Sequence, residues 1–254
     1  MLKLLSVSAI FLSDVHLQDA TSVKTRLVIR FLQEVASQFK KIYILGDLFD
    51  VWPGTTPYLI ERFKPVTDVL RSLSRQGHEV HYIEGNHDFR LGSYFSDELG
   101  VQVHTDELSI TLGDKKVYLA HGDLGNPSER GYRLLRSLLR QDLLHLALRP
   151  VPPKWIFDLG VRTSGASRRY QETKEYPQGA TRIRQIYRAS AEKIFYQGYD
   201  VVVMGHTHLP DDVTTLINGR KCRYINTGDW VQNFTYLEFD GSDFYTKSHP
   251  MTDL

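Results

Sequence analysis

The feature that most constrains the fold of this chain is a repeated order of apolar strand, polar loop and amphipathic helix in its first half. Residues 4–12, 41–45 and 79–83 are short, largely apolar runs, and each ends in a polar cluster. Residues 23–39 and 58–76, which lie between them, have the apolar period of helices that cover a sheet. This alternation predicts an α/β sheet with parallel strands, whose polar residues gather at the carboxyl ends of the strands.

The second half follows a different pattern. A Gly-Asp-Lys turn at residues 113–115 separates two alternating strands, and Asn218-Gly219 and Asp240-Gly241 are further hairpin turns. We therefore expect an antiparallel β layer after the parallel one.

Residues 127–198 fit neither pattern. Leucines recur at helical spacing between residues 132 and 148, and three prolines follow before residue 154. The segment has 14 Lys and Arg against 6 Asp and Glu, a net charge of +8, so the remainder of this +1 chain is at −7. We expect one domain over residues 1–254 with an inserted helical lid at about residues 127–198.

The composition of the whole chain, 41% hydrophobic and 24% charged, gives no global signature of nucleic-acid binding. A single cysteine, Cys222, cannot form an intramolecular disulfide, and we expect it to be a small apolar residue of a strand. Residues 1–11 lack the pattern of a signal peptide, and no apolar run has the roughly 18 residues of a spanning helix. We expect a cytoplasmic protein with peripheral membrane contact at most, no nucleic-acid partner and no obligate protein partner.

Five polar clusters follow strand-like runs. In chain order they contain Asp14 and His16; Asp47 and Asp50; Asn86, His87 and Asp88; His121; and His206 and His208. Each cluster alone is more often a cap or a solvated loop, but five of them at strand ends would rarely assemble by chance. Carboxylate, imidazole and amide ligands suit divalent ions, and six or seven of them with one shared carboxylate can hold two ions. The sequence therefore predicts a dinuclear metal centre.

In the order Asp-x-His, Gly-Asp-x-x-Asp, Gly-Asn-His-Asp, His and Gly-His-x-His, these clusters resemble the complete pattern of the calcineurin-like metallophosphoesterases over residues 8–230. The resemblance implies an α/β fold, a four-layer α/β/β/α sandwich. It also implies that one metal is held by Asp14, His16, Asp47 and His208, and the other by Asp47, Asn86, His121 and His206. Manganese is the expected metal, and the same ligands accept zinc, iron or magnesium.

Two neighbouring cations activate water and stabilise charge on phosphoryl oxygens, so hydrolysis needs no covalent intermediate. By the same resemblance, His87 lies beside the substrate, where an imidazolium stabilises charge or protonates the leaving oxygen. We predict His87 and Asp88 as the catalytic residues, with Asp88 orienting His87. Asp50 and Asp123 are expected either to hold the ligands in place or to order the loops, without binding metal themselves.

The lid indicates the class of substrate. Its leucines, together with Trp155 and Phe157, exceed what a small helical pair needs for its own packing, and arginines follow closely. An apolar wall beside a basic rim suits an amphiphilic phosphorylated ligand at a membrane surface. The alternative is that the leucines dock the lid on the core, and the pattern alone favours neither.

The chain further resembles the branch of the superfamily that includes the UDP-2,3-diacylglucosamine diphosphatases of lipid A biosynthesis, through residues 11–17 and 46–50 and through Glu129 and Tyr132. In that branch the insertion is a helical cap that receives acyl chains. The resemblance implies hydrolysis of UDP-2,3-diacylglucosamine to lipid X (2,3-diacylglucosamine 1-phosphate) and UMP by a peripheral protein of the inner membrane. It implies substrate contacts from Asn86, His87, Glu129, Tyr132, Arg162, Ser164, Ser167 and Arg168.

His87 departs from this branch, because the best known members carry arginine after the asparagine of the third cluster. The exchange replaces a permanent cation by a titratable one. A phosphodiesterase or phosphatase acting on a nucleotide, a phosphoprotein or another lipid therefore remains an alternative. A non-catalytic binding scaffold, such as a retromer subunit, is a third, but such scaffolds tend to lose ligands that this chain keeps.

Overall fold

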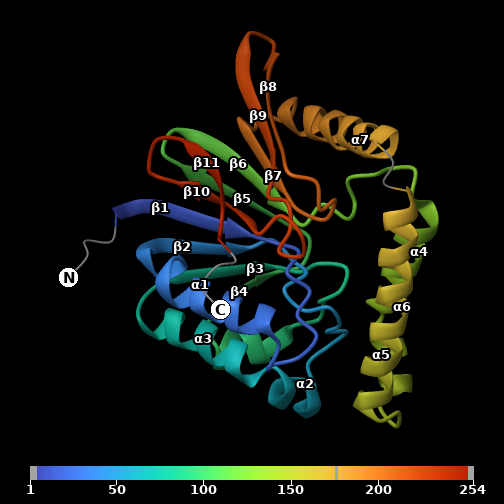
Figure 1. The fold of residues 1–254 in the computed structure, drawn as a ribbon. Helices are drawn as coiled ribbons and strands as arrows, with labels where there is room; N and C mark the ends of the chain where they lie inside the picture. Colours follow the sequence, from blue (N-terminus) through green and yellow to red (C-terminus); the bar gives the residue numbers. More distant parts are fainter. Residues whose placement is uncertain (1–4, 175–176, 251–254) are drawn as a thin grey trace.

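Two β-sheets pack face to face at the centre of the molecule (Figure 1). The computed structural model describes residues 5–174 and 177–250, apart from the side chains of residues 5–7 and 165–178. The first sheet has the strand order β11-β10-β1-β2-β3-β4, formed by β1 (Leu5–Leu12), β2 (Phe39–Ile44), β3 (Glu79–Ile83), β4 (Gln102–His104), β10 (Thr235–Phe239) and β11 (Phe244–Ser248). The second has the order β5-β6-β7-β9-β8, formed by β5 (Glu107–Leu112), β6 (Lys115–Ala120), β7 (Val201–Met204), β8 (Asp211–Ile217) and β9 (Arg220–Asn226).

The alternation of side chains along the strands creates a hydrophobic core on each face of each sheet. In β1, Ile10 and Leu12 belong to the core beneath the helices, whereas Phe11 belongs to the core between the sheets. In β7, Val203 faces the first sheet and Val202 faces the outer helix. The covering helices are α1 (Val23–Glu34), α2 (Pro57–Arg62) and α3 (Lys64–Arg75) on the first sheet, with the short turns Ala36–Gln38 and Tyr94–Glu98, and α7 (Pro177–Phe195) on the second. The order of layers is α/β/β/α, which confirms the expected four-layer sandwich.

Two helix boundaries differ from the expected ones. The helix predicted over residues 58–76 is divided at Phe63, because Pro65 lacks an N–H group and begins a new helix in the first turn of α3. The helix predicted over residues 23–39 ends at Glu34, and β2 begins already at Phe39.

The second sheet is mixed, so the prediction of an antiparallel layer was wrong. Its three central strands β6, β7 and β9 are parallel, and only the outer strands β5 and β8 pair in antiparallel fashion. The long connection through α7 allows β7 to return parallel to β6, which a tight hairpin cannot do. The hairpin of β10 and β11 joins the first sheet beside β1.

Three helices, α4 (Arg130–Leu139), α5 (Asp142–Leu148) and α6 (Pro153–Lys174), stand beside the sandwich in Figure 1, and we call them the lid helices. No side chain of α4 or α5 is buried. Phe157 of α6 is buried and packs against Tyr58 and Phe63. The fourth helix of the segment expected as a lid, α7, packs on the second sheet through Tyr187 and Phe195.

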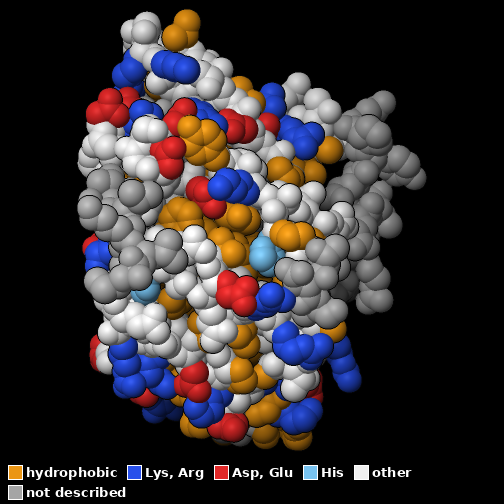
Figure 2. Space-filling view, turned by 60° about the vertical axis from the view of Figure 1, so that its left-hand side comes forward, with side chains coloured by type: hydrophobic (Ala, Val, Ile, Leu, Met, Phe, Trp, Pro, Cys, Tyr) orange, Lys and Arg blue, Asp and Glu red, His pale blue; other side chains and the backbone are white. Residues whose placement is uncertain are grey.

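The surface is mixed in chemical character. On the face shown in Figure 2, basic and acidic side chains are interspersed, and hydrophobic side chains gather along its middle. Across the described residues, no helix has both the length and the apolar composition that crossing a bilayer requires.

Candidate metal centre

The structure brings all seven predicted ligands together at the carboxyl ends of strands from both sheets. Asp14 and His16 follow β1, Asp47 follows β2, Asn86 follows β3, His121 follows β6, and His206 and His208 follow β7. Because the strands within each of these two groups are parallel, their carboxyl ends meet at one edge. The two edges adjoin, and Asp47 of one lies next to His121 of the other.

The backbone of this edge is unusual. Five of the predicted ligands, none of them glycine, have φ between 52° and 68°: Asp14, His16, Asp47, His206 and His208. Such left-handed conformations cost free energy and gather at functional sites, where the surrounding structure holds them in place. Glycine gives the ligands room, because a Cβ atom at Gly85 would overlap the Asp47 carboxylate and one at Gly205 that of Asp14.

One half of the centre is formed by Asp14, His16 and His208. The Nε2 atoms of the two histidines lie 3.2 Å apart. Asp14 Oδ1 lies 3.6 Å from His208 Nε2 and 4.0 Å from His16 Nε2. This oxygen is buried and has no hydrogen-bond partner among the described residues. A buried carboxylate oxygen facing two imidazole nitrogens fits a shared cation.

The other half is formed by Asn86, His121 and His206. Asn86 Oδ1 lies 2.9 Å from both His121 Nε2 and His206 Nδ1. His121 Nδ1 lies 2.8 Å from the Leu45 carbonyl, which can only accept a hydrogen bond, so the proton of a neutral His121 is on Nδ1. Burial lowers the pKa of His121, but the Asp47 carboxylate outweighs it and holds this pKa well above its ordinary value, so an ion that binds Nε2 has to displace a proton there. Burial and then His121 lower the pKa of His206 to about 4, which favours the neutral imidazole that binds metal.

Asp47 joins the two halves. Its Oδ2 lies 3.8 Å from His16 Nε2 and 3.4 Å from His121 Nε2. Burial opposes the ionisation of Asp47, but His121 and His87 outweigh it and hold the pKa of Asp47 well below its ordinary value. An ionised carboxylate between the imidazoles of the two halves is the arrangement expected for a bridging ligand.

Two further carboxylates lie next to the Nδ1 atoms of His16 and His208, on the side away from the centre. Asp50 Oδ1 lies 3.6 Å from His16 Nδ1, and Asp229 Oδ2 lies 3.5 Å from His208 Nδ1. Although burial raises the pKa of Asp229, hydrogen bonds from His208 and from backbone N–H groups hold it at about 2. Asp229 was not among the predicted site residues, although its position shortly after β9 repeats the pattern of a polar residue following an apolar strand. Asp123 accepts hydrogen bonds from the lid instead of supporting a ligand directly.

The expected role of Asp88 needs correction. We expected it to orient His87, but its carboxylate accepts hydrogen bonds from the Asp47, Phe49 and Gly85 N–H groups and from the Tyr82 hydroxyl. Asp88 thus fixes the loop that carries Asp47. Burial and the Asp47 carboxylate raise the pKa of Asp88 to about 7.

His87 is oriented by the main chain. Its Nδ1 lies 2.8 Å from the Asp50 carbonyl, so Nδ1 carries a proton, and its Nε2 faces Asp47 Oδ2 at 3.9 Å. The side chain is 21% exposed, which leaves Nε2 open to a ligand above the metal centre.

The lid residues predicted to bind substrate lie in several environments. The Tyr132 hydroxyl donates to Asp123 Oδ2 at 2.5 Å, and the Ser164 hydroxyl donates to Asp50 Oδ1 at 2.7 Å. Glu129 accepts a hydrogen bond from Asn126, and Arg162 is exposed on α6. The side chains of Ser167 and Arg168 lie outside the described part of the chain.

This fold and this donor set define a class of proteins, the metal-dependent hydrolases with two adjacent cations. The family model of the calcineurin-like phosphoesterases matches residues 8–210, and the chain belongs to this family. It is therefore a metal-dependent phosphoesterase.

Its relatives share most of the chain. A UDP-2,3-diacylglucosamine hydrolase of Aromatoleum aromaticum is 30% identical over 242 residues, which cover 93% of this chain and 94% of that protein. One of Haemophilus influenzae is 32% identical over 235 residues, which cover 91% and 94%. Among solved structures, Vps29 of Entamoeba histolytica with bound zinc is 16% identical, at 97% and 93% coverage and a TM-score of 0.43.

Proposed function

We propose that the seven side chains hold two divalent ions, one through Asp14, His16, Asp47 and His208, and the other through Asp47, Asn86, His121 and His206. The unpartnered Asp14 oxygen and the Asp47 carboxylate between the two histidine groups support this assignment. Manganese is the proposed metal, since the mixed oxygen and nitrogen ligands suit it. The ions supply activated water and charge stabilisation at phosphorus.

The proposed reaction is hydrolysis of the diphosphate bond of UDP-2,3-diacylglucosamine, which yields lipid X and UMP. Water attacks one phosphorus and the bond to the bridging oxygen breaks, so that each product keeps one phosphate. The names of relatives about 30% identical over more than 90% of the chain support this substrate. His87, whose Nε2 faces the centre, is placed to stabilise charge or to protonate the leaving oxygen.

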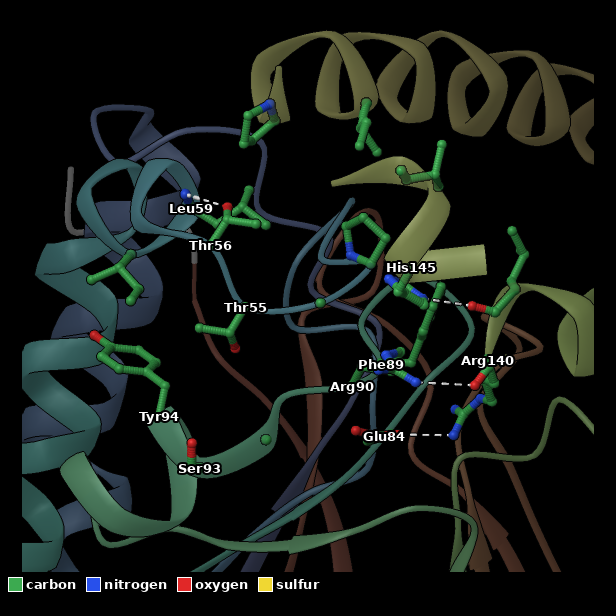
Figure 3. A pocket seen from close by; sticks show the side chains of 18 of the residues that line it. Thr55, Thr56, Leu59, Glu84, Phe89, Arg90, Ser93, Tyr94, Arg140 and His145 are labelled. Atoms are coloured by element: carbon green, nitrogen blue, oxygen red, sulfur yellow. Dashed lines mark hydrogen bonds and ion pairs between the residues drawn. The ribbon is translucent and has the colours of Figure 1, made fainter. Parts of the chain in front are cut away.

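The observation that carries this proposal is a cavity of about 1100 Å³ between the core and the lid helices (Figure 3). Phe89 and Arg90, two and three residues after His87 in the chain, are among the residues that line it, although none of the seven proposed ligands does. Leu139, Leu144 and Leu148 of the lid line it, as do apolar residues at the start of α6. A space of this size and character beside a phosphoester centre suits acyl chains.

Other lid leucines lie outside the cavity lining and face solvent. Leu134, Leu138 and Leu143 are more than half exposed, so they do not form a core with the sandwich. Arg162, Ser167 and Arg168 on α6, with Glu129, Tyr132 and Ser164, remain the proposed polar contacts to the sugar and phosphates.

The test is an assay of purified protein with UDP-2,3-diacylglucosamine, in which UMP and lipid X are quantified with and without manganese after chelation. Equal amounts of both products that depend on added metal are expected. No release of either product from the metal-loaded protein would refute the proposed substrate.

Peripheral contact with the inner membrane is part of the same proposal. Trp155 and Leu159 are exposed at 67% and 63%, and Lys154 and Arg162 lie on the same helix. Exposed apolar residues beside cations bind anionic lipid surfaces. Sedimentation with anionic vesicles tests this, and a protein that stays in the supernatant at low salt would contradict it.

A second candidate function is supported by His87. A titratable cation at this position also serves a phosphodiesterase or phosphatase for another lipid, a nucleotide or a phosphoprotein. Turnover of a simple aryl phosphodiester at a rate above that of UDP-2,3-diacylglucosamine would favour this alternative.

A further inference from the structure

One face of helix α4 is polar and turned toward the core. Tyr132, Arg136 and Arg140 follow one another at intervals of four residues, which places them in a row on the helix surface. Arg136 Nε donates to Asp123 Oδ2 at 2.7 Å, the same oxygen that accepts from Tyr132. Arg140 Nη1 donates to Glu84 Oε2 at 2.8 Å, and its Nη2 donates to the Gly85 carbonyl at 3.1 Å.

Each of these acceptors adjoins a loop of the metal centre. Asp123 lies two residues after His121, and Glu84 lies two residues before Asn86. The Gly85 carbonyl belongs to the peptide bond that leads into Asn86. Asn86 and His121 meet directly, with 2.9 Å between Asn86 Oδ1 and His121 Nε2. The polar face of α4 therefore holds two loops that come from different sheets and converge on the same half of the centre.

A residue of the core, Arg90, also donates hydrogen bonds to the lid. Arg90 Nη1 donates to the Arg140 carbonyl at 3.1 Å (Figure 3). It also donates to Asp142 Oδ1 at 2.6 Å. Glu84 Oε1 accepts from the Leu91 N–H group at 2.9 Å. The hydrogen bond between Glu84 and Leu91 thus closes the loop that contains Asn86 and His87. Arg90 joins this loop to the turn between α4 and α5.

These contacts are protected from water. The side chains of Arg136 and Arg140 are each 13% exposed, and those of Asp123 and Glu84 are each 6% exposed. Breaking such a pair leaves a partly buried charge without its partner, which costs free energy. We therefore expect both pairs to form when α4 packs against the core and to break when it does not. Since α4 has no buried side chain, these polar contacts hold the helix more than apolar packing does.

We propose that Arg136 and Arg140 are positioning residues, which couple the seating of the lid to the geometry of the Asn86 and His121 loops. With the lid seated, the half of the centre formed by Asn86, His121 and His206 binds its ion tightly; when α4 lifts, this half loosens. The inference rests on the proposed ligand assignment. It predicts communication between lid and metal even without substrate.

The test compares Mn²⁺ binding by the wild-type protein with binding by Arg136→Gln and Arg140→Gln, using electron paramagnetic resonance of free Mn²⁺. The wild type should bind two ions. In each variant the affinity for one ion should fall by up to about 10-fold, the lower end of the effect of losing a group bonded to a metal ligand, because the arginines contact the ligand loops and not the ligands themselves; the other ion should bind as before. Arg130→Gln removes the same charge from an exposed position on the same helix and should bind like the wild type.

The possible results distinguish a failure of the proposed metal centre from a failure of the proposed coupling. A wild-type protein that binds fewer than two ions refutes the proposed metal centre. Two ions bound with unchanged affinity in both variants refute the coupling, and the arginines then only fasten the lid. If Arg140→Gln does not fold, the pair Glu84→Gln with Arg140→Met removes both charges, and the same weakening of one ion is expected there.

Discussion

Asp47 is the residue on which both halves of the centre depend, because its carboxylate lies between His16 and His121. We expect Asp47→Ala to lose both ions and nearly all hydrolysis while the fold persists, since the hydrophobic cores do not involve this carboxylate. Metal analysis and circular dichroism of the purified variant provide the measurement. Asp47→Asn is the companion variant, because asparagine tolerates the φ of 55° at this position better than alanine does. Two ions retained by both variants would rule out a bridging role.

His87 makes a separate contribution. We expect His87→Ala to lower kcat by roughly 10²-fold, the range of positioned acid catalysis, with metal content unchanged. Its Nδ1 is held by the Asp50 carbonyl, so Nε2 alone can serve the substrate. His87→Arg restores a cation without a titratable proton and shows which property matters. A kcat that stays at the wild-type value at every pH would mean that His87 only fills space.

His81 offers a pH dependence away from the metal centre. It is buried on β3, stacks on Tyr43 and lies 3.2 Å from His104. Burial, with help from His104 and Lys41, lowers the pKa of His81 to about 4, whereas Glu79 acts in the opposite direction. The unfolded chain therefore binds a proton near pH 6.5 that the folded protein takes up only near pH 4, and the free energy of unfolding decreases as the pH falls between these values.

We expect His81 to account for about 2 kcal/mol of lost stability between pH 7 and pH 5. His81→Gln, which cannot titrate, should lose less stability over the same interval. Urea unfolding of the metal-free proteins at both pH values measures the difference. Equal losses in the two proteins would show that the pKa of His81 is the same in the folded and unfolded states.

Single residues could be predicted from the sequence where they belong to a recognisable motif. The convergence of the seven proposed ligands could be predicted because each cluster follows an apolar strand, and parallel strands bring their ends together. Their left-handed backbone could not be read from the chain, because aspartate and histidine adopt it only when tertiary contacts compensate the strain. Arg136 and Arg140 gave no signal, since an arginine on a helix usually faces solvent.

At the scale of elements, the lid helices determine substrate selection under the proposed function. Leu138, Leu139 and Leu143 are exposed, and Leu139 and Leu144 line the cavity. Each buried methylene contributes roughly 0.8 kcal/mol, so acyl chains add more affinity than sugar and phosphate alone. Replacing these four leucines by serine should raise KM for UDP-2,3-diacylglucosamine steeply and leave turnover of a small soluble phosphodiester nearly unchanged.

The control for this variant is Leu216→Ser, which changes a leucine that is 72% exposed on β8, away from the lid helices in Figure 1. Both substrates are assayed on one preparation of each protein. A parallel fall of the two activities in the lid variant would mean that the leucines maintain the structure and do not select the substrate.

The elements also show where sequence patterns lose information. The apolar period of 3.6 residues continues across residues 58–76 and hides the division at Phe63, which Pro65 causes in the first turn of α3. The hairpin at Asp240-Gly241 was predicted from the turn alone, and β10 and β11 confirm it. Which sheet this hairpin joins depends on long-range pairing with β1, which no local pattern encodes.

At the scale of the whole molecule, the proposed metal centre takes its ligands from both sheets. Asp14, His16, Asp47 and Asn86 come from strands of the first sheet, whereas His121, His206 and His208 come from the second. The unfolded chain cannot hold these ligands together, so ions bind the folded state and stabilise it by mass action. At a free concentration of 100 times Kd, each ion adds about 2.7 kcal/mol, which corresponds to a rise in Tm of about 5–10 °C in a chain of this length.

Chelation of the purified protein should therefore lower its Tm, and stepwise addition of Mn²⁺ should restore it with a dependence on metal concentration. The Asp47→Ala variant serves as the control, because a protein that has lost its bridging ligand should show little response to either treatment. If Arg136 and Arg140 couple the lid to the centre, their Gln variants should regain only part of the increase at metal concentrations that saturate the wild type. A Tm that is the same with chelator and with Mn²⁺ would mean that ions do not link the sheets, and the proposed ligand assignment would then fail at the level of the whole fold.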